Sequence, residues 1–143
     1  MINPAIFKAY DIRGKYPKEI NEEAVAEIAG ALAGYFERKA KSLPAGRHGV
    51  KRKIIVVGHD ARLSSPSLYE TVIHSLKIEN WKLEIEAVGL ITTPMLYFLV
   101  NNLKAIGGIM ITASHNPKEF NGLKIVGPKA EMISGETVKK LIS

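Results

Sequence analysis

Ile54-Ile55-Val56-Val57-Gly58 is an uninterrupted run of β-branched residues closed by a glycine, and it follows a polar, basic stretch. A strand that is buried on both faces has this composition, as in parallel sheets that are covered by helices. Residues 83–88 also have the pattern of a strand, and residues 107–112 form a further apolar run. The sequence therefore predicts a sheet with at least one strand enclosed from both sides.

Helix signals lie between these predicted strands. Asn21 is suited to cap a helix over residues 21–39, because two acidic residues follow it in the first turn, where the helix dipole favours negative charge. Ser65-Pro66 and Thr93-Pro94 mark two further helix starts, and a last helix begins at residues 134–136. Spacings of three and four residues predict the core-facing positions, which are Val25, Ile28, Leu32 and Phe36, then Leu68, Val72 and Leu76, then Met95, Leu96, Leu99 and Leu103.

Alternation of strands and helices with short connections favours an α/β fold. We expect a three-layer α/β/α arrangement, with helices on both faces of a mainly parallel, mixed sheet that has an antiparallel edge. Residues 123–126 form a shorter predicted strand, and Lys124 interrupts its apolar residues as on an edge strand. The length of 143 residues fits one α/β domain over residues 1–143.

The formal net charge of +6 has a local origin. Residues 38–53 contain seven cations and no carboxylate, and without them 13 basic and 14 acidic residues remain. The segment contains proline and glycine and no aromatic residue, whereas nucleic-acid binders combine a basic face with aromatic residues or a known motif. We therefore expect no nucleic-acid partner, and we predict that residues 40–52 form a mobile surface loop. A basic binding patch is the open alternative.

The chain has no cysteine, which excludes disulfides and cysteine metal sites. No apolar run approaches the roughly 20 residues that cross a bilayer, and the first residues show no signal-peptide pattern. We therefore expect a cytoplasmic protein with no membrane partner.

Two polar loops follow predicted strands, at residues 58–65 and 112–122. Ligands of open α/β sheets gather at the carboxyl ends of the strands. The second loop begins Thr112-Ala113-Ser114-His115-Asn116-Pro117, which concentrates groups that bind anions or transfer groups. If residues 123–126 pair antiparallel with residues 107–112, Lys124 returns towards Ser114, and a lysine there suits phosphoryl chemistry. From residue types alone, a polar turn without chemistry remains the alternative.

Other loop chemistries are disfavoured. The chain has no Gly-x-Ser-x-Gly motif of a serine hydrolase, no P-loop and no Gly-x-Gly-x-x-Gly motif of a dinucleotide-binding fold. Asp60 and Arg62 in the first loop are interpreted as a pair that braces the loop, and contact with the substrate is the alternative. His48 and His74 have no ligand partners at metal spacing, and we assign them no site.

Three motifs resemble those of the α-D-phosphohexomutase superfamily. Residues 112–117, continuing through Asn121-Gly122 to Lys124, are similar to its active-serine signature. Phe7-Lys8-Ala9-Tyr10-Asp11-Ile12-Arg13-Gly14 resembles its amino-terminal motif, in the form of the phosphomannomutase/phosphoglucomutase branch, and residues 58–65 resemble a third element. The motifs occur in the family's order and extend over nearly the whole chain.

The resemblance implies a mechanism. Ser114 would be phosphorylated and would give its phosphoryl group to a hexose monophosphate, through a glucose or mannose bisphosphate intermediate. Mg²⁺ would bind Ser114 through its phosphate. The implied substrate-binding residues are Tyr10, Arg13 and Asn116, and the implied residues for proton transfer and phosphate stabilisation are His115 and Lys124. Packing, ion-pair and exposed-surface roles remain the alternatives for Tyr10, Arg13 and Lys124.

The family's metal motif, Asp-Gly-Asp-Gly-Asp-Arg, does not occur in this sequence. In the family, that motif and the sugar- and phosphate-binding loops lie in three further domains. The resemblance therefore implies the amino-terminal domain of a larger mutase, with hexose phosphates and the remaining domains as partners, and predicts that residues 1–143 alone are inactive. A non-catalytic basic binding module that retains the fold is the alternative function.

Overall fold

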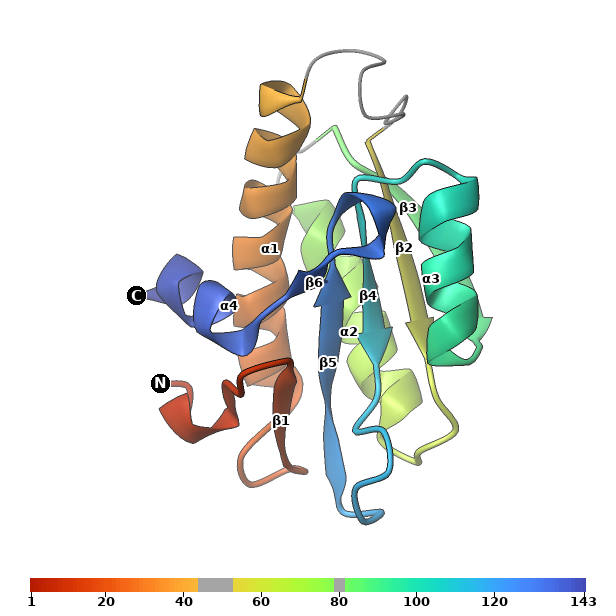
Figure 1. Ribbon diagram of the computed structural model, residues 1–143. Coiled ribbons are helices and arrows are strands. Elements are labelled where there is room, and N and C mark those ends of the chain that lie inside the picture. The colour runs from red at the N-terminus through yellow and green to blue at the C-terminus, as the bar shows by residue number, and fades with distance from the viewer. Residues whose placement is uncertain (44–52, 79–81) are drawn as a thin grey trace.

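The computed structural model describes residues 1–43, 53–78 and 82–143 (Figure 1). It contains one mixed sheet with the strand order β1-β5-β4-β2-β3, and β6 pairs with β5 outside this path. The strands are β1 (Ile12–Lys15), β2 (Ile54–His59), β3 (Glu84–Leu90), β4 (Gly107–Ile111), β5 (Phe120–Val126) and β6 (Met132–Ile133). The helices are α1 (Glu22–Ser42), α2 (Ser65–Ile78), α3 (Thr93–Asn102) and α4 (Gly135–Ile142), with short 3₁₀ turns η1 (Pro4–Ile6) and η2 (Pro128–Ala130).

Strand direction follows from the pairings. β2 is parallel to β3 and to β4, whereas β5 is antiparallel to β4, β1 and β6. β5 therefore runs against all the other strands of the sheet. This arrangement confirms the predicted mixed, mainly parallel sheet with an antiparallel side.

The two faces of β2 contact different helices, because successive side chains of a strand point to opposite faces. Ile55 and Val57 belong to the larger core with the inner faces of α1 and α2. Val56 belongs to the second core, where it accompanies Leu96 and Val100 of α3. Figure 1 shows α3 on the opposite side of the sheet from α1. The predicted three-layer α/β/α fold is thus confirmed.

The position of the last long strand differs from the prediction. β5 lies inside the sheet, between β4 on one side and β1 and β6 on the other, so it is not the edge strand. Lys124 is half-buried and stands opposite Met110 of β4. The sequence placed Lys124 on an edge strand because the strands that pair with the outer side of β5 could not be recognised. These strands, β1 and β6, are too short to be detected in the sequence.

Helix α3 also differs in its inner face. Leu96 and Val100 are fully buried, and Leu99 and Leu103 pack partly against the same core, but Met95 is half exposed. The predicted helix starts are otherwise confirmed. The Asn21 side chain accepts a hydrogen bond from the backbone N–H of Ala24 at 3.0 Å, as an N-cap does.

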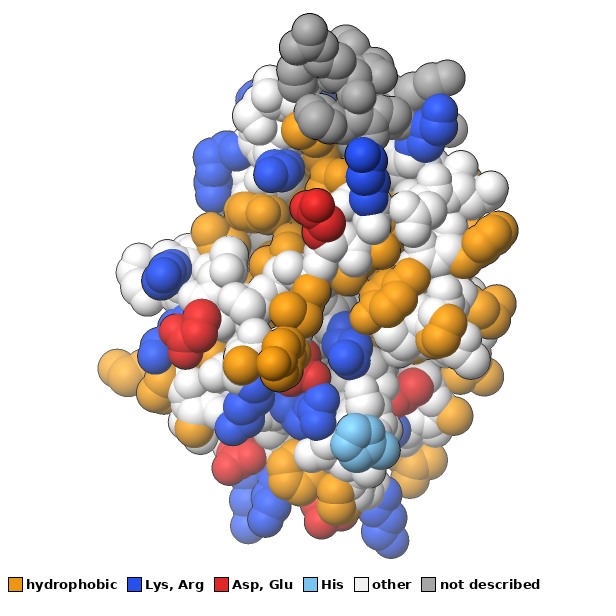
Figure 2. Space-filling model, viewed as in Figure 1, with side chains coloured by type: hydrophobic (Ala, Val, Ile, Leu, Met, Phe, Trp, Pro, Cys, Tyr) orange, Lys and Arg blue, Asp and Glu red, His pale blue; other side chains and the backbone are white. Residues whose placement is uncertain are grey.

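The predicted mobile loop over residues 40–52 falls mostly on residues 44–52, which lie outside the described residues. Two described cations of the basic segment are paired. Lys53 and Lys41 lie 2.9 Å and 3.7 Å from the carboxylate of Glu37. Basic side chains also gather beside the undescribed residues at the top of Figure 2. Within residues 1–43, 53–78 and 82–143, no helix is long and apolar enough to cross a membrane.

Candidate active site

The two polar loops lie side by side at one end of the sheet. β2 and β4 are adjacent parallel strands, so the loops that follow them leave the same edge. The backbone N–H of Asp60 donates to the carbonyl of Ile111 at 3.0 Å, which continues the strand pairing into the loops. Thr112 is held from the other side, because its N–H donates to the carbonyl of Gly122 at 3.0 Å. These bonds bring the predicted serine loop and the loop after β2 together.

Ser114 is exposed and has an unusual backbone conformation. Its φ angle is 54°, in the left-handed region that non-glycine residues seldom adopt. Its N–H donates to the side-chain oxygen of Thr112 at 2.9 Å, and the carbonyl of Ala113 accepts from the N–H of Asn116 at 3.1 Å. The loop thus turns sharply at Ser114 and presents the hydroxyl outside the sheet.

Arg62 connects the two loops. Its guanidinium donates to the carbonyls of Ser114 at 2.8 Å and Asn116 at 2.7 Å. It also donates to the carbonyls of Pro117 at 2.7 Å and Phe120 at 3.1 Å. The interpretation of Arg62 as a loop brace agrees with these contacts.

Asp60 binds Arg62 and orients its side chain. Its carboxylate accepts from Arg62 Nε at 3.2 Å and from the Thr112 hydroxyl at 2.8 Å. It also accepts from the N–H of Arg62 at 3.1 Å and from the hydroxyl of Ser65. One carboxylate therefore joins the loop after β2, the start of α2 and the end of β4.

Asn121, in β5, is fully buried beneath the two loops. Its amide group donates to the hydroxyls of Ser64 at 2.8 Å and Ser65 at 3.0 Å. Its amide oxygen accepts from the N–H of Gly122 at 2.8 Å. Asn121 thus fixes the first loop to β5, a role that its residue type alone did not reveal.

Arg13 reaches the serine loop from β1. Its guanidinium donates to the side-chain oxygen of Asn116 and pairs with the buried carboxylate of Asp11. The structure therefore brings together two of the predicted substrate-binding residues, Arg13 and Asn116. Burial and the negative charge of Asp11 raise the pKa of Tyr97 in α3.

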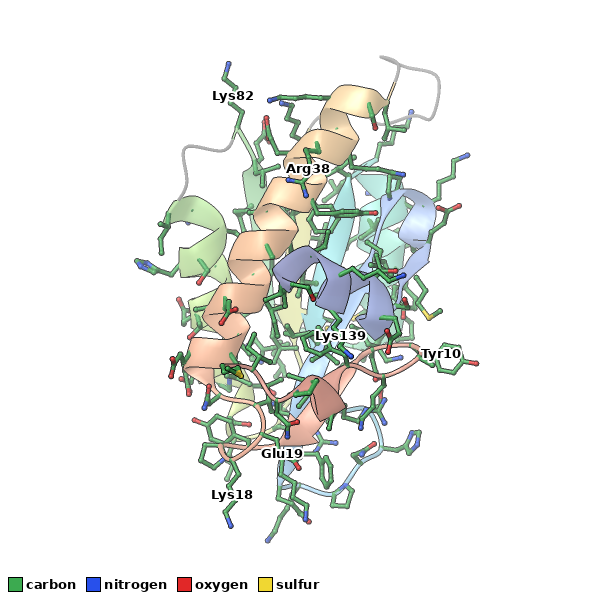
Figure 3. All side chains as sticks on the ribbon, turned by 90° about the vertical axis from the view of Figure 1, so that its left-hand side faces the viewer. Tyr10, Lys18, Glu19, Arg38, Lys82 and Lys139 are labelled. Carbon is green, nitrogen blue, oxygen red and sulfur yellow. The ribbon has the colours of Figure 1, made fainter. Side chains whose placement is uncertain are left out.

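Three other predicted residues lie apart from these contacts. Tyr10 is 68% exposed, and Figure 3 shows its ring pointing away from the body of the molecule. His115 is exposed beside Ser114, and Lys124 is half-buried in β5. Within the described ranges, no hydrogen bond or ion pair holds any of the three side chains. Their predicted roles stay predictions.

Two pockets border the loops. A pocket of about 690 Å³ is lined by residues of both loops, with Ser114 and Asn116 on one side and Asp60, Ala61, Arg62 and Leu63 on the other. A second pocket of about 420 Å³ lies between the strand ends and the start of α3, and Asp60, Thr92, Met110 and Thr112 are among its lining residues. A ligand in the larger pocket would be in contact with the Ser114 loop.

Mg²⁺ requires about six oxygen ligands in octahedral geometry. Among the described residues, no three His, Asp or Glu side chains are grouped so that they could hold a metal ion. Asp60 and Glu119 are the carboxylates of the larger pocket, and both oxygens of Asp60 already accept hydrogen bonds. The residues present do not form a Mg²⁺ site by themselves.

Comparisons with known proteins show which family the chain resembles. The family described as phosphoglucomutase/phosphomannomutase, alpha/beta/alpha domain I, matches residues 4–143. The chain is 40% identical over 131 residues to the phosphohexose mutases of Xanthomonas campestris pv. campestris (strain B100), covering 92% of this chain and 26% of that protein. It is 37% identical over 138 residues to the phosphoglucomutase of Neisseria gonorrhoeae, covering 96% of this chain and 27% of the relative.

A solved structure is similar as well. The phosphoglucomutase/phosphomannomutase family protein of Burkholderia thailandensis superposes with a TM-score of 0.79 at 29% identity, over 99% of this chain and 30% of that one. The chain thus spans about a quarter of the length of the curated relatives it matches.

Proposed function

The chain belongs to the phosphoglucomutase/phosphomannomutase family, as its α/β/α domain I, and we propose that it supplies the serine that carries the phosphoryl group of a hexose-phosphate mutase. In this proposal, residues 1–143 form one domain of a longer enzyme. That enzyme interconverts hexose 1-phosphate and hexose 6-phosphate, with mannose or glucose as the sugar.

One observation carries the proposal. The hydroxyl of Ser114 is exposed at the rim of the larger pocket, on a turn whose backbone is held from below by Arg62. A phosphoserine carries about −1.5 to −2 charges at neutral pH. The cations of Arg13, Arg62 and Lys118 belong to the same loops or touch them. Asp11, Asp60 and Glu119 offset these cations, so the proposal rests on the exposure and position of the Ser114 hydroxyl and not on the local charge.

The proposed reaction has two phosphoryl transfers. A hydroxyl oxygen of the hexose monophosphate attacks the phosphorus atom of phosphorylated Ser114. The bond between that phosphorus and the Ser114 oxygen breaks, and a hexose bisphosphate forms. The sugar hydroxyl gives up its proton, and the serine oxygen takes one. In the second transfer, the Ser114 oxygen attacks the other phosphate of the bisphosphate and gives up its proton. The bond between that phosphorus and the sugar oxygen breaks, the sugar oxygen takes a proton, and the isomeric monophosphate is released. His115 and Lys124 are the candidates for moving these protons, and Tyr10, Arg13 and Asn116 for binding the sugar phosphate.

Mg²⁺, which neutralises charge in phosphoryl transfer, would need ligands from outside the described residues. Binding of the sugar phosphate would also need groups from outside these residues, because the larger pocket is formed by two loops of this domain only. We therefore propose that the remaining domains of the polypeptide supply both, and that residues 1–143 alone do not turn over substrate.

The test is to phosphorylate the full-length protein with glucose 1,6-bisphosphate and to locate the phosphate by peptide mass spectrometry. We expect phosphate at Ser114, and loss of both the phosphate and mutase turnover in Ser114→Ala. Ser42→Ala is the matched control, because Ser42 is also an exposed serine and lies at the far end of α1. Normal turnover by Ser114→Ala, measured in a coupled assay on glucose 1-phosphate and mannose 1-phosphate, would refute the proposal.

A further inference from the structure

We propose that Arg62 is the positioning residue of the serine loop: it sets the course of the backbone at Ser114 and does not bind the substrate. This inference rests on the proposed function of Ser114, because positioning matters for the reaction only if Ser114 carries the phosphoryl group.

Every donor of Arg62 is engaged. A guanidinium has five N–H groups, and each has a partner in the structure. Nε donates to the Asp60 carboxylate, Nη1 donates to two backbone carbonyls, and Nη2 donates to two more. A phosphate in the adjacent pocket could bond to Arg62 only by displacing one of these partners. Arg62 lines the pocket, yet its hydrogen bonds point into the protein.

The orientation of the guanidinium is itself determined. Asp60 accepts from Arg62 Nε and from the backbone N–H of Arg62, so the carboxylate is hydrogen-bonded to both the side chain and the backbone of that residue. The Asp60 carboxylate is anchored in turn by Thr112 and Ser65. The Arg62 side chain is only 13% exposed. Because the group is planar and its donors form a rigid fork, a fixed Nε also fixes the directions of the other four N–H groups.

The serine loop depends on these donors. Ser114 and Asn116 lie outside the strands, so their carbonyls have no partner strand. In the part of the chain that the structure describes, Arg62 is the only residue that donates a hydrogen bond to either carbonyl. Ser114 also has a left-handed φ, a conformation that persists when surrounding contacts hold it. Without Arg62, both carbonyls would lose their hydrogen bonds, and the bonds donated by the N–H groups of Ser114 and Asn116 would be left to hold the turn.

Arg13 differs from Arg62 in how many of its N–H donors are hydrogen-bonded. Its Nε is buried and has no hydrogen-bond partner, although its two terminal nitrogens are engaged by Asn116 and Asp11. Each terminal nitrogen of Arg13 carries two N–H groups and has one partner, and the side chain is 21% exposed, so Arg13 retains donors for a ligand and Arg62 does not. The two residues should affect the kinetics differently.

The experiment uses the full-length mutase with Arg62→Met, Arg62→Lys and the control Arg38→Met. Arg38 is exposed on α1 and is labelled in Figure 3. The first readout is amide hydrogen exchange, compared between residues 114–120 and the amides of β2 and β4. The second readout is kcat and KM in the coupled assay, together with the rate at which glucose 1,6-bisphosphate phosphorylates Ser114.

For Arg62→Met we expect faster exchange in residues 114–120 and unchanged exchange in β2 and β4. We expect kcat to fall about 100-fold, the order expected when a reacting group is displaced by about 1 Å, with KM nearly unchanged. Arg62→Lys should recover part of the loss, because an ammonium has three donors on a single nitrogen. Arg38→Met should match the parent protein in both readouts.

Two results would overturn the inference. One is unchanged exchange at residues 114–120 in Arg62→Met; the other is a raised KM with a preserved kcat, which would assign Arg62 to substrate binding. If Arg62→Met does not fold, Arg62→Lys decides by the same two readouts. Absence of phosphate at Ser114 in the parent protein would instead refute the proposed function, and the exchange measurement would still decide whether Arg62 holds the loop.

Discussion

The hydroxyl of Thr112 donates to the carboxylate of Asp60 at 2.8 Å and thereby joins the end of β4 to the loop after β2. The same oxygen accepts from the N–H of Ser114 at 2.9 Å. We predict that Thr112→Val, which keeps the shape of the side chain, lowers the free energy of unfolding by about 1–3 kcal/mol, because it removes a part-buried hydrogen bond to a carboxylate and the partner of the Ser114 N–H. Denaturant unfolding followed by circular dichroism measures the change.

Thr71→Val is the matched control for this substitution. The Thr71 hydroxyl bonds only to the carbonyl of Ser67 in its own helix and is exposed to water. Surface substitutions of this kind change stability by less than about 0.5 kcal/mol. Equal effects of the two substitutions would show that the bond between Thr112 and Asp60 contributes nothing to the stability of the loops.

A second prediction concerns Gly122 of β5. A Cβ atom at this position would lie 2.0 Å from the carbonyl oxygen of Ile12 and 3.1 Å from the Cα of Arg13, and both neighbours are backbone atoms of β1. Gly122→Ala must therefore push β1 away from β5. We expect a loss of about 1–3 kcal/mol in the free energy of unfolding, the usual cost of overpacking.

Gly30→Ala has the opposite expected sign. Nothing lies within 4 Å of a Cβ at Gly30, which is inside α1. Alanine is favoured over glycine in a helix interior by about 0.8–1.0 kcal/mol. Thermal or denaturant unfolding of both variants tests the pair, and a Gly122→Ala variant as stable as the parent would show that β1 does not lie where the structure has it.

Much of the layer structure was predictable from the sequence, because each element has its own signal. The apolar run at β2 predicted a strand buried on both faces, and Asn21 predicted the start of α1. β1 and β6 have four and two residues, too few for an alternation of side chains to be detected. The interior position of β5, and with it the setting of Lys124, therefore required the three-dimensional arrangement.

The candidate site was predictable only in part. Ser114, Arg13 and Asn116 lie in recognisable motifs, and the structure brings the last two into contact. The carbonyl contacts of Arg62 have no sequence signal, since every residue has a carbonyl and the contacts depend on how the loop turns. The same reasoning applies to Asn121, whose partners lie 56 and 57 positions away along the chain.

A third prediction concerns the ion pair between Glu37 and Lys53. Glu37 is 4% exposed, and the hydrogen bond from Lys53 lowers the pKa of its carboxyl group below the ordinary value of 4.5. We expect Lys53→Met to lower the free energy of unfolding by about 1–3 kcal/mol at pH 7, because a buried carboxylate loses its nearest partner. Lys18→Met, at an exposed site labelled in Figure 3, is the control.

The pH dependence of this effect has a defined sign. A carboxyl group with a lowered pKa in the folded state stabilises the fold above its unfolded pKa, and this contribution is lost as the pH falls through the folded pKa. The difference between Lys53→Met and the parent protein should therefore shrink as the pH falls below about 4.5. A difference that stays constant from pH 7 to pH 3 would show that packing of the lysine stem, rather than its charge, is responsible.

The last prediction concerns residues 1–143 as an isolated chain. The two hydrophobic cores form without any partner, so we expect cooperative unfolding. We expect no mutase turnover, because phosphoryl transfer depends on positioning and charge neutralisation, and the described residues hold no cluster that could bind a metal ion. Mg²⁺ and glucose 1-phosphate should each stabilise the chain by less than about 0.4 kcal/mol at concentrations below their dissociation constants. A thermal-shift titration and the coupled assay measure both quantities, and turnover that disappears in Ser114→Ala would show that this domain suffices for the reaction.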